Sequence, residues 1–144
     1  MYNHILVAYD GSEGAKKALK NSLELAKKLK TDLTALWIGG YRAYYHETVA
    51  EIEQEEKSVE AFSKKLKKEL MQISQKEGVE VAFAYLQGNP AKLIVEYAAK
   101  NKIDLIVIGC SGHSRLWGND LGHVTDKVSE NAKCNVLIAR CVRE

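Results

Sequence analysis

The sequence feature that most constrains the fold is an alternation of short apolar runs with longer amphipathic segments. Strand-sized aliphatic runs are expected at Tyr2 to Tyr9, Leu33 to Ile38, Val79 to Tyr85, Asp104 to Ile108 and Val136 to Ala139. Between them, apolar residues recur at helical spacing from Ala15 to Leu29, Ile52 to Ile73, Leu93 to Ala98 and around Val124 and Val128. Right-handed crossovers between such strands require a mainly parallel sheet. The sequence therefore predicts a doubly wound α/β domain with helices on both faces, in three α/β/α layers.

The bulk properties are those of one ordinary globular domain, residues 1–144. The chain is long enough for a single core and short for two. Its net charge is only +2, and its lysines are mixed with glutamates, so nucleic acid is not expected as a partner. No apolar run approaches the roughly 18 residues of a membrane span, so no membrane association is expected.

Cysteine usage and the first residues favour a cytoplasmic protein. The three cysteines form no CxxC pair, which argues against a disulfide framework and a structural zinc site. The chain enters its first apolar run at once, without an export leader. We therefore expect reduced thiols in a cytosol.

The segment after the fourth apolar run is the strongest candidate for a binding site. Four glycines, at 109, 112, 118 and 122, fall within fourteen residues. Glycine lets backbone N–H groups turn toward an anion, and Gly122-His123 opens a helix whose N-terminus favours a phosphate. The glycines could instead serve only to turn the chain, but strand-to-helix connections usually need about 2 to 6 residues. The Walker A and GxGxxG patterns are absent, so the loop is expected to be another kind of phosphate site.

The spacing of these glycines resembles the motif G-x2-G-x9-G-[ST] of the nucleotide-binding universal stress proteins, with Gly109, Gly112 and Gly122 in place. Four further segments are similar to that family in the same order: Ile5 to Ser12, Gly88-Asn89-Pro90, Asp104 to Gly109 and Cys134 to Ile138. The resemblance implies a sheet in the order 3-2-1-4-5 and an adenine nucleotide alpha hydrolase-like fold. It also implies ATP, or AMP or ADP, as the ligand. His123 stands where the family has Ser or Thr, so a hydroxyl expected to donate to a phosphate is missing.

The residues expected to contact the nucleotide are selected from this resemblance and from the chemistry of their side chains. They are Asp10, Ile38, Gly109, Ser111, Gly112, Arg115, Gly122, His123, Val124 and Thr125. Asp10 can accept from a ribose hydroxyl or hold Mg²⁺ against the phosphates, or it can simply cap the following turn. Arg115 can meet a phosphate or lie on the surface. Cys110 has no identified base or resolving partner and is interpreted as a small packing residue.

Three functions remain open. The first is a nucleotide-binding stress or signalling protein in which occupancy alters partner choice or dimer state, with at most slow ATP hydrolysis. The second is a family member that has lost nucleotide binding and acts through protein contacts, which His123 favours. The third is an adenylating or hydrolysing enzyme. The segment Asp10 to Gly14 lacks the SGGxDS-like pattern of such enzymes, and no set of catalytic residues is visible in the sequence. The resemblance also implies a homodimer paired through the fifth strand, Val136 to Ala139.

Overall fold

The computed structural model describes residues 2–39, 48–110 and 123–140. Strands and helices alternate within these ranges. The strands are β1 (His4–Ala8), β2 (Asp32–Gly39), β3 (Val81–Gln87), β4 (Leu105–Gly109) and β5 (Asn135–Ala139). The helices are α1 (Glu13–Leu29), α2 (Val49–Glu77), α3 (Pro90–Lys100) and α4 (His123–Asn131).

The five strands form one parallel sheet in the order β3-β2-β1-β4-β5, which confirms the predicted topology. Ile5 of β1 is in register with Leu33 of β2 on one side and with Leu105 of β4 on the other. The winding therefore reverses between β1 and β4, where consecutive connections leave in opposite directions. In such sheets this is the point beyond which ligands bind.

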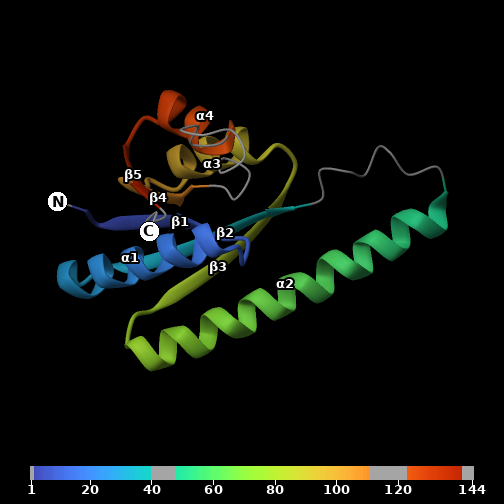
Figure 1. The fold of residues 1–144 in the computed structure, drawn as a ribbon, viewed down its shortest axis with the longest axis horizontal. Helices are drawn as coiled ribbons and strands as arrows, with labels where there is room; N and C mark the ends of the chain where they lie inside the picture. The colour runs from blue at the N-terminus through green and yellow to red at the C-terminus, as the bar shows by residue number, and fades with distance from the viewer. Residues whose placement is uncertain (1, 40–47, 111–122, 141–144) are drawn as a thin grey trace.

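Helices α1 and α2 cover one face of the sheet, and α3 and α4 cover the other (Figure 1). Alternate strand residues explain the two cores, because Ile5 and Val7 pack with the residues of α1 and α2, whereas Leu6 packs with those of α3 and α4. The predicted three-layer arrangement is thus observed, with β1 buried on both faces. None of the helices in the described ranges is long and apolar enough to cross a membrane.

Helix caps follow the sequence signals, whereas the strand bounds differ slightly. Ser12 caps α1, and Asn89 caps α3 ahead of Pro90, because both residue types favour the cap position and proline favours the first helical turn. β1 is shorter than Tyr2 to Tyr9 because its pairing with β2 runs only from His4 to Ala8, while the N–H groups of Asn3 and His4 donate to the Asp104 carboxylate. β3 begins later and ends later than expected, since its pairing with β2 runs on to Gly39 and Gln87.

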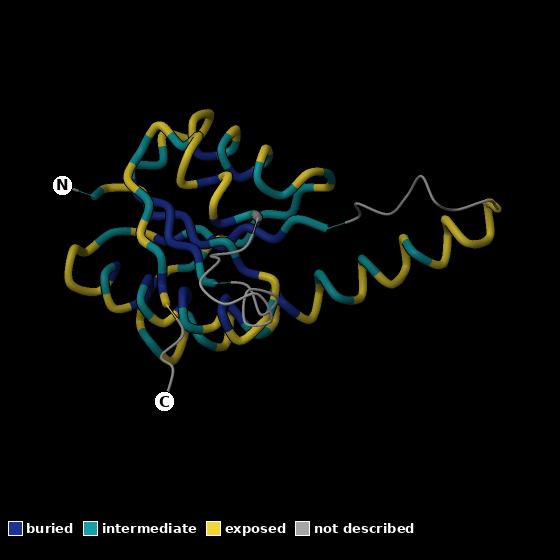
Figure 2. Tube along the Cα trace, turned by 45° about the horizontal axis from the view of Figure 1, so that its top comes forward, coloured by how far each residue is buried: buried dark blue, intermediate teal, exposed yellow. Residues whose placement is uncertain are grey.

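Helix α2 is longer than the sheet surface beneath it. Leu66 and Leu70, in its C-terminal half, are each 1% exposed and pack on the β1–β2 side of the sheet. Its N-terminal turns extend past the sheet and are largely exposed (Figures 1 and 2). Val49 there is 72% exposed. The apolar pattern of α2 therefore continues beyond the part that its own sheet covers.

Candidate functional site

A cavity of about 510 Å³ opens at the carboxyl ends of β1, β2 and β4. Its lining divides in two. Asp10, Ser12 and Thr125 supply side-chain oxygens, whereas Leu36, Ile38 and Ile94 supply an aliphatic surface. A few polar groups converging on an apolar pocket are typical of small-molecule sites. The cavity lies at the topological switch point identified above.

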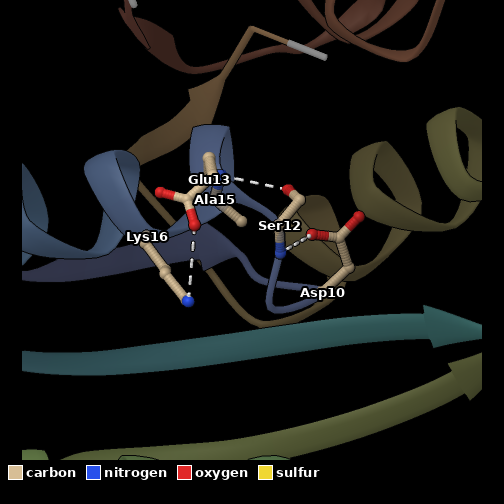
Figure 3. A network of polar contacts seen from close by, with 5 residues as sticks. All are labelled: Asp10, Ser12, Glu13, Ala15 and Lys16. Atoms are coloured by element: carbon tan, nitrogen blue, oxygen red, sulfur yellow. Dashed lines mark hydrogen bonds and ion pairs between the residues drawn. The ribbon is translucent and has the colours of Figure 1, made fainter. Parts of the chain in front are cut away.

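Asp10 is held by the turn that joins β1 to α1. Its Oδ1 accepts a hydrogen bond from the Ser12 N–H at 2.9 Å, and the Ser12 Oγ accepts from the Ala15 N–H at 3.3 Å (Figure 3). Gly11 between them has φ +84°, a value that favours glycine. The second carboxylate oxygen points away from Ser12 (Figure 3). Asp10 therefore caps the turn with one oxygen and presents the other outward.

The first turn of α1 touches the end of β4 directly. A Cβ at Gly14 would overlap the carbonyl oxygen of Cys110, and a Cβ at Gly109 would overlap the carbonyl oxygen of Gly14. Glycine is required at both positions for the backbones to come this close. The contact joins two walls of the cavity, one from the β1–α1 turn and one from the end of β4.

Thr125 joins the start of α4 to the same strand end. Its hydroxyl donates to the Gly109 carbonyl oxygen at 3.0 Å, and the residue is only 1% exposed. Val124, beside it, lines the cavity. The N-terminal N–H groups of α4 have no partners within the helix, so this end of the cavity favours an anion.

The apolar wall is built by β2 and α3. Ile38 is partly buried near the end of β2, and Pro90 and Ile94 come from α3, which Asn89 caps through a 3.2 Å bond to the Lys92 N–H. Trp37 also lines the cavity. Its ring stacks on Tyr85 and meets Phe62 edge-on, with centroid separations of 4.8 Å in both pairs. This aromatic contact makes the apolar wall continuous with the core under α2.

Tyr9 completes the wall on the β1 side. The residue is 3% exposed, and burial is the main reason why the pKa of its hydroxyl is raised above 10.0, with Glu69 and Asp10 adding to the effect. Tyr9 therefore remains neutral at physiological pH. Among the described residues, no group of three or more His, Cys, Asp or Glu side chains could hold a metal ion.

The structure brings five of the predicted site residues to one cavity: Asp10, Ile38, Gly109, Val124 and Thr125. Ser111, Gly112, Arg115 and Gly122 lie outside the described residues, and His123 is described only as the first residue of α4. Sequence reasoning missed Ser12, Pro90 and Ile94 as lining residues. The Asn89-Pro90 helix start was a usable signal, because it follows a parallel strand and so lies at the same edge of the sheet.

A family model and individual relatives identify the same protein family. A model of the Universal stress protein family matches residues 1–140. The chain is 33% identical over 147 residues to universal stress protein MJ0531 of Methanocaldococcus jannaschii, covering 97% of this chain and 83% of that protein. It is also 33% identical over 148 residues to universal stress protein YxiE of Bacillus subtilis, covering 97% and 100%.

Solved structures agree with the fold. Universal stress protein UspA from Lactobacillus plantarum superposes with a TM-score of 0.82 at 28% identity, over 96% of this chain and 98% of that chain. Two more distant structures contain ligands. A universal stress protein in complex with cAMP gives a TM-score of 0.71 at 23% identity, over 96% and 97%. An Arabidopsis thaliana family protein with AMP bound gives 0.70 at 18% identity, over 97% and 92%.

Proposed function

The chain belongs to the universal stress protein family, and from that premise we propose that it binds an adenine nucleotide in the cavity between β1 and β4. The observation that carries the proposal is the divided lining of this cavity, with carboxylate and hydroxyl oxygens on one side and aliphatic side chains on the other. A nucleotide has the same division, since its base is flat and largely apolar and its ribose and phosphates are polar.

The groups that line the cavity can be matched to the base, the ribose and the phosphates of the nucleotide. Leu36, Ile38 and Ile94 form an apolar surface for the base. The outward oxygen of Asp10 is an acceptor for a ribose hydroxyl, or a ligand for Mg²⁺ carried by the phosphates. The phosphates are then assigned to the N-terminus of α4 and to the glycine-rich segment that precedes it. ATP, ADP and AMP share these features, and the family neighbours that contain cAMP and AMP support the adenine class.

The proposed role is binding rather than turnover. The polar groups described around the cavity include no activated nucleophile or paired carboxylates, and hydrolysis is proposed to be slow at most. The chain is proposed to act in the cytoplasm as one 144-residue domain. Nucleotide occupancy would then act as a signal in a stress response by changing how this domain associates with partner proteins or with a second copy. A homodimer through β5 fits this role, since β5 lies at an edge of the sheet with Leu137 36% exposed.

A second candidate is a family member that acts through protein contacts alone. His123, the first residue of α4, occupies the place of the motif hydroxyl and favours this alternative. Without that donor, phosphate binding depends on backbone N–H groups and on the remaining side chains.

The deciding experiment examines the protein as purified and after emptying. Denaturation followed by mass spectrometry should release an adenine nucleotide, and calorimetric titration of ATP into the refolded, emptied protein should show binding that Mg²⁺ strengthens. GTP serves as the competing ligand. Absence of carry-over, together with no ATP binding at millimolar concentration, would contradict the proposal and leave the protein-contact alternative.

A further inference from the structure

Helix α2 carries an apolar stripe that continues beyond its own sheet. Ile52, Val59, Leu66 and Ile73 recur at intervals of seven residues, the spacing of a helix that packs along its length. Leu66 is buried and Val59 is partly buried, but Ile52 is 38% exposed and Val49, one turn earlier, is 72% exposed. Figure 2 shows this N-terminal half extending away from the rest of the molecule. The stripe is therefore covered by the sheet at one end only, among the residues described.

The charges of α2 are segregated along its axis. Residues 49–62 contain five glutamates and one lysine, whereas residues 63–77 contain five lysines and two glutamates. A helix dipole favours acids in the first turn and bases in the last turn, and its effect fades within those turns. Glu56 and Glu60 on one side of the middle, and Lys64 and Lys67 on the other, lie too far inside for that explanation. Glu60 and Lys64 form an exposed ion pair within the helix at 3.4 Å, but an acidic half followed by a basic half is also the charge pattern that a second, oppositely directed copy would complement.

A groove runs between this helix and the edge strand β3. It has a volume of about 540 Å³ and is lined by Glu56, Val59, Lys64 and Lys67 of α2 and by Tyr85 and Gln87 of β3. The Tyr85 hydroxyl is buried and has no hydrogen-bond partner among the described residues. Burial, aided by Glu55, raises the pKa of Tyr85 above 10.0, so the hydroxyl stays a donor. The groove thus combines both charge signs, an apolar floor and an unsatisfied donor.

We propose that α2 is a self-association surface, in which α2 of a second copy lies antiparallel in the groove between α2 and β3. Antiparallel pairing sets the acidic half of each helix against the basic half of the other, and the two-fold axis makes both contacts at once. It also places the exposed Val49 and Ile52 of each copy opposite the C-terminal turns of the other copy's α2, where Met71 is 54% exposed. Parallel pairing would oppose like charges along the whole helix. The surface is separate from the nucleotide cavity and from the β5 edge.

Charge reversal on the full-length protein tests the proposal. One variant reverses the basic half, Lys64→Glu with Lys67→Glu, and a second reverses the acidic half, Glu53→Lys with Glu56→Lys. A third combines all four changes and so restores complementarity between two identical copies. The matched control reverses two exposed lysines of α1, Lys20→Glu with Lys28→Glu. Circular dichroism verifies that each variant is folded, and sedimentation equilibrium at low and high salt measures assembly.

Each two-residue reversal in α2 should raise the dissociation constant of the α2 contact about tenfold or more, and the combined variant should recover most of that loss. Added salt should weaken the wild-type contact. If copies also pair through β5, the α2 reversals reduce a larger assembly to a dimer; otherwise they reduce a dimer to a monomer. A wild-type protein that is monomeric at several hundred micromolar, reversals that leave the mass unchanged, or a combined variant that fails to reassociate would each overturn the proposal. Nucleotide titration of the same variants is independent, so failure of one proposal leaves the other standing.

Discussion

Gly14, in the first turn of α1, and Gly109, the last residue of β4, pack backbone against backbone. A Cβ on either residue would overlap a main-chain carbonyl oxygen, that of Cys110 for Gly14 and that of Gly14 for Gly109. Because main-chain atoms cannot rotate away as a long side chain can, the contact fixes the distance between the start of α1 and the end of β4, on either side of the switch point.

Gly14→Ala should destabilise the protein. Overpacking costs about 1–3 kcal/mol, and we expect the upper part of that range here because backbone must move. Alanine gains up to about 1 kcal/mol over glycine within a helix, which leaves a net loss of about 1–2 kcal/mol. Urea denaturation measures the difference. Glu24→Ala, at an exposed position of α1, is the control and should be close to neutral; equal stability of Gly14→Ala and wild type would show that the backbones are not in contact.

Asp10→Asn should weaken ATP binding without unfolding the turn. The amide oxygen still accepts from the Ser12 N–H, so the loop is retained, but the charged acceptor and Mg²⁺ ligand is lost. We expect affinity to fall roughly tenfold or more, with a larger fall when Mg²⁺ is present. Asp32→Asn, at the opposite end of the sheet, makes the same chemical change away from the cavity. Calorimetry should give equal affinities for Asp32→Asn and wild type, and an unchanged affinity in Asp10→Asn would exclude the carboxylate as a ligand.

Thr125→Val keeps the side-chain shape and removes the hydroxyl that donates to the Gly109 carbonyl. Since Thr125 is 1% exposed, the orphaned carbonyl cannot easily regain a partner, and a loss of about 1–2 kcal/mol is expected. Thermal denaturation is the measurement. The control is Thr34→Val in β2, whose hydroxyl makes no hydrogen bond to any of the residues that the structure describes and should matter little. If both variants have the wild-type midpoint, the bond to Gly109 does not stabilise the start of α4.

Asp104 gives the fold a defined pH dependence. Burial alone would raise the pKa of this carboxyl, but hydrogen bonds from the N–H groups of Asn3 and His4 outweigh it and hold the pKa below 3.8. The carboxylate therefore stabilises the folded chain fully above about pH 4, and this stabilisation is lost as the pH falls through the lowered pKa. Asp104→Asn should cost about 1 kcal/mol at pH 7, and the difference from wild type should shrink below pH 4. Urea titrations at several pH values measure the free energy of unfolding of the wild type, of Asp104→Asn and of the control Glu130→Gln. A difference between wild type and Asp104→Asn that stays constant with pH would contradict the prediction.

His123→Ser restores the hydroxyl that the family motif has at the start of α4. If phosphates bind there, ATP affinity should rise about tenfold or more, the value of one hydrogen bond to a charged group. Calorimetry at one fixed pH compares the variant with the wild type. A fall in affinity would instead identify the histidine as a ligand. Ser129→Ala, on the exposed end of the same helix, controls for changes in helix stability.

Local sequence signals accounted for most of the fold. The caps at Ser12 and Asn89 could be predicted because capping depends on residues within one helical turn, and the strand order followed from the resemblance carried by Gly109 and its flanking segments. Strand ends were less predictable. Asn3 belongs to the first apolar run by position, but its N–H bonds to Asp104, a residue distant in sequence.

The site was also predictable only in part, because local sequence signals identify some of its residues, whereas others depend on contacts between residues distant in sequence. Asp10 follows β1 and was expected at the switch point, Thr125 was expected in the site from its place after the last glycine of the motif, and both line the cavity. The need for glycine at position 14 arises from contact with β4, which no local pattern encodes. Likewise, the period of α2 identifies its apolar face, but not how far the sheet extends beneath it.

The position of Trp37 has a practical consequence. Its indole ring lines the cavity and stacks on Tyr85, which in turn lines the groove beside α2. The chain contains only one other tryptophan, Trp117. With Trp117 replaced by phenylalanine, and with excitation beyond the absorption of the seven tyrosines, the remaining tryptophan fluorescence comes from Trp37, which adjoins both proposed contact regions. The intensity and wavelength of this emission should therefore change when a ligand enters the cavity or a second copy enters the groove. Titrating the unlabelled protein with nucleotide, and separately raising its own concentration, shows which of the two events occurs first.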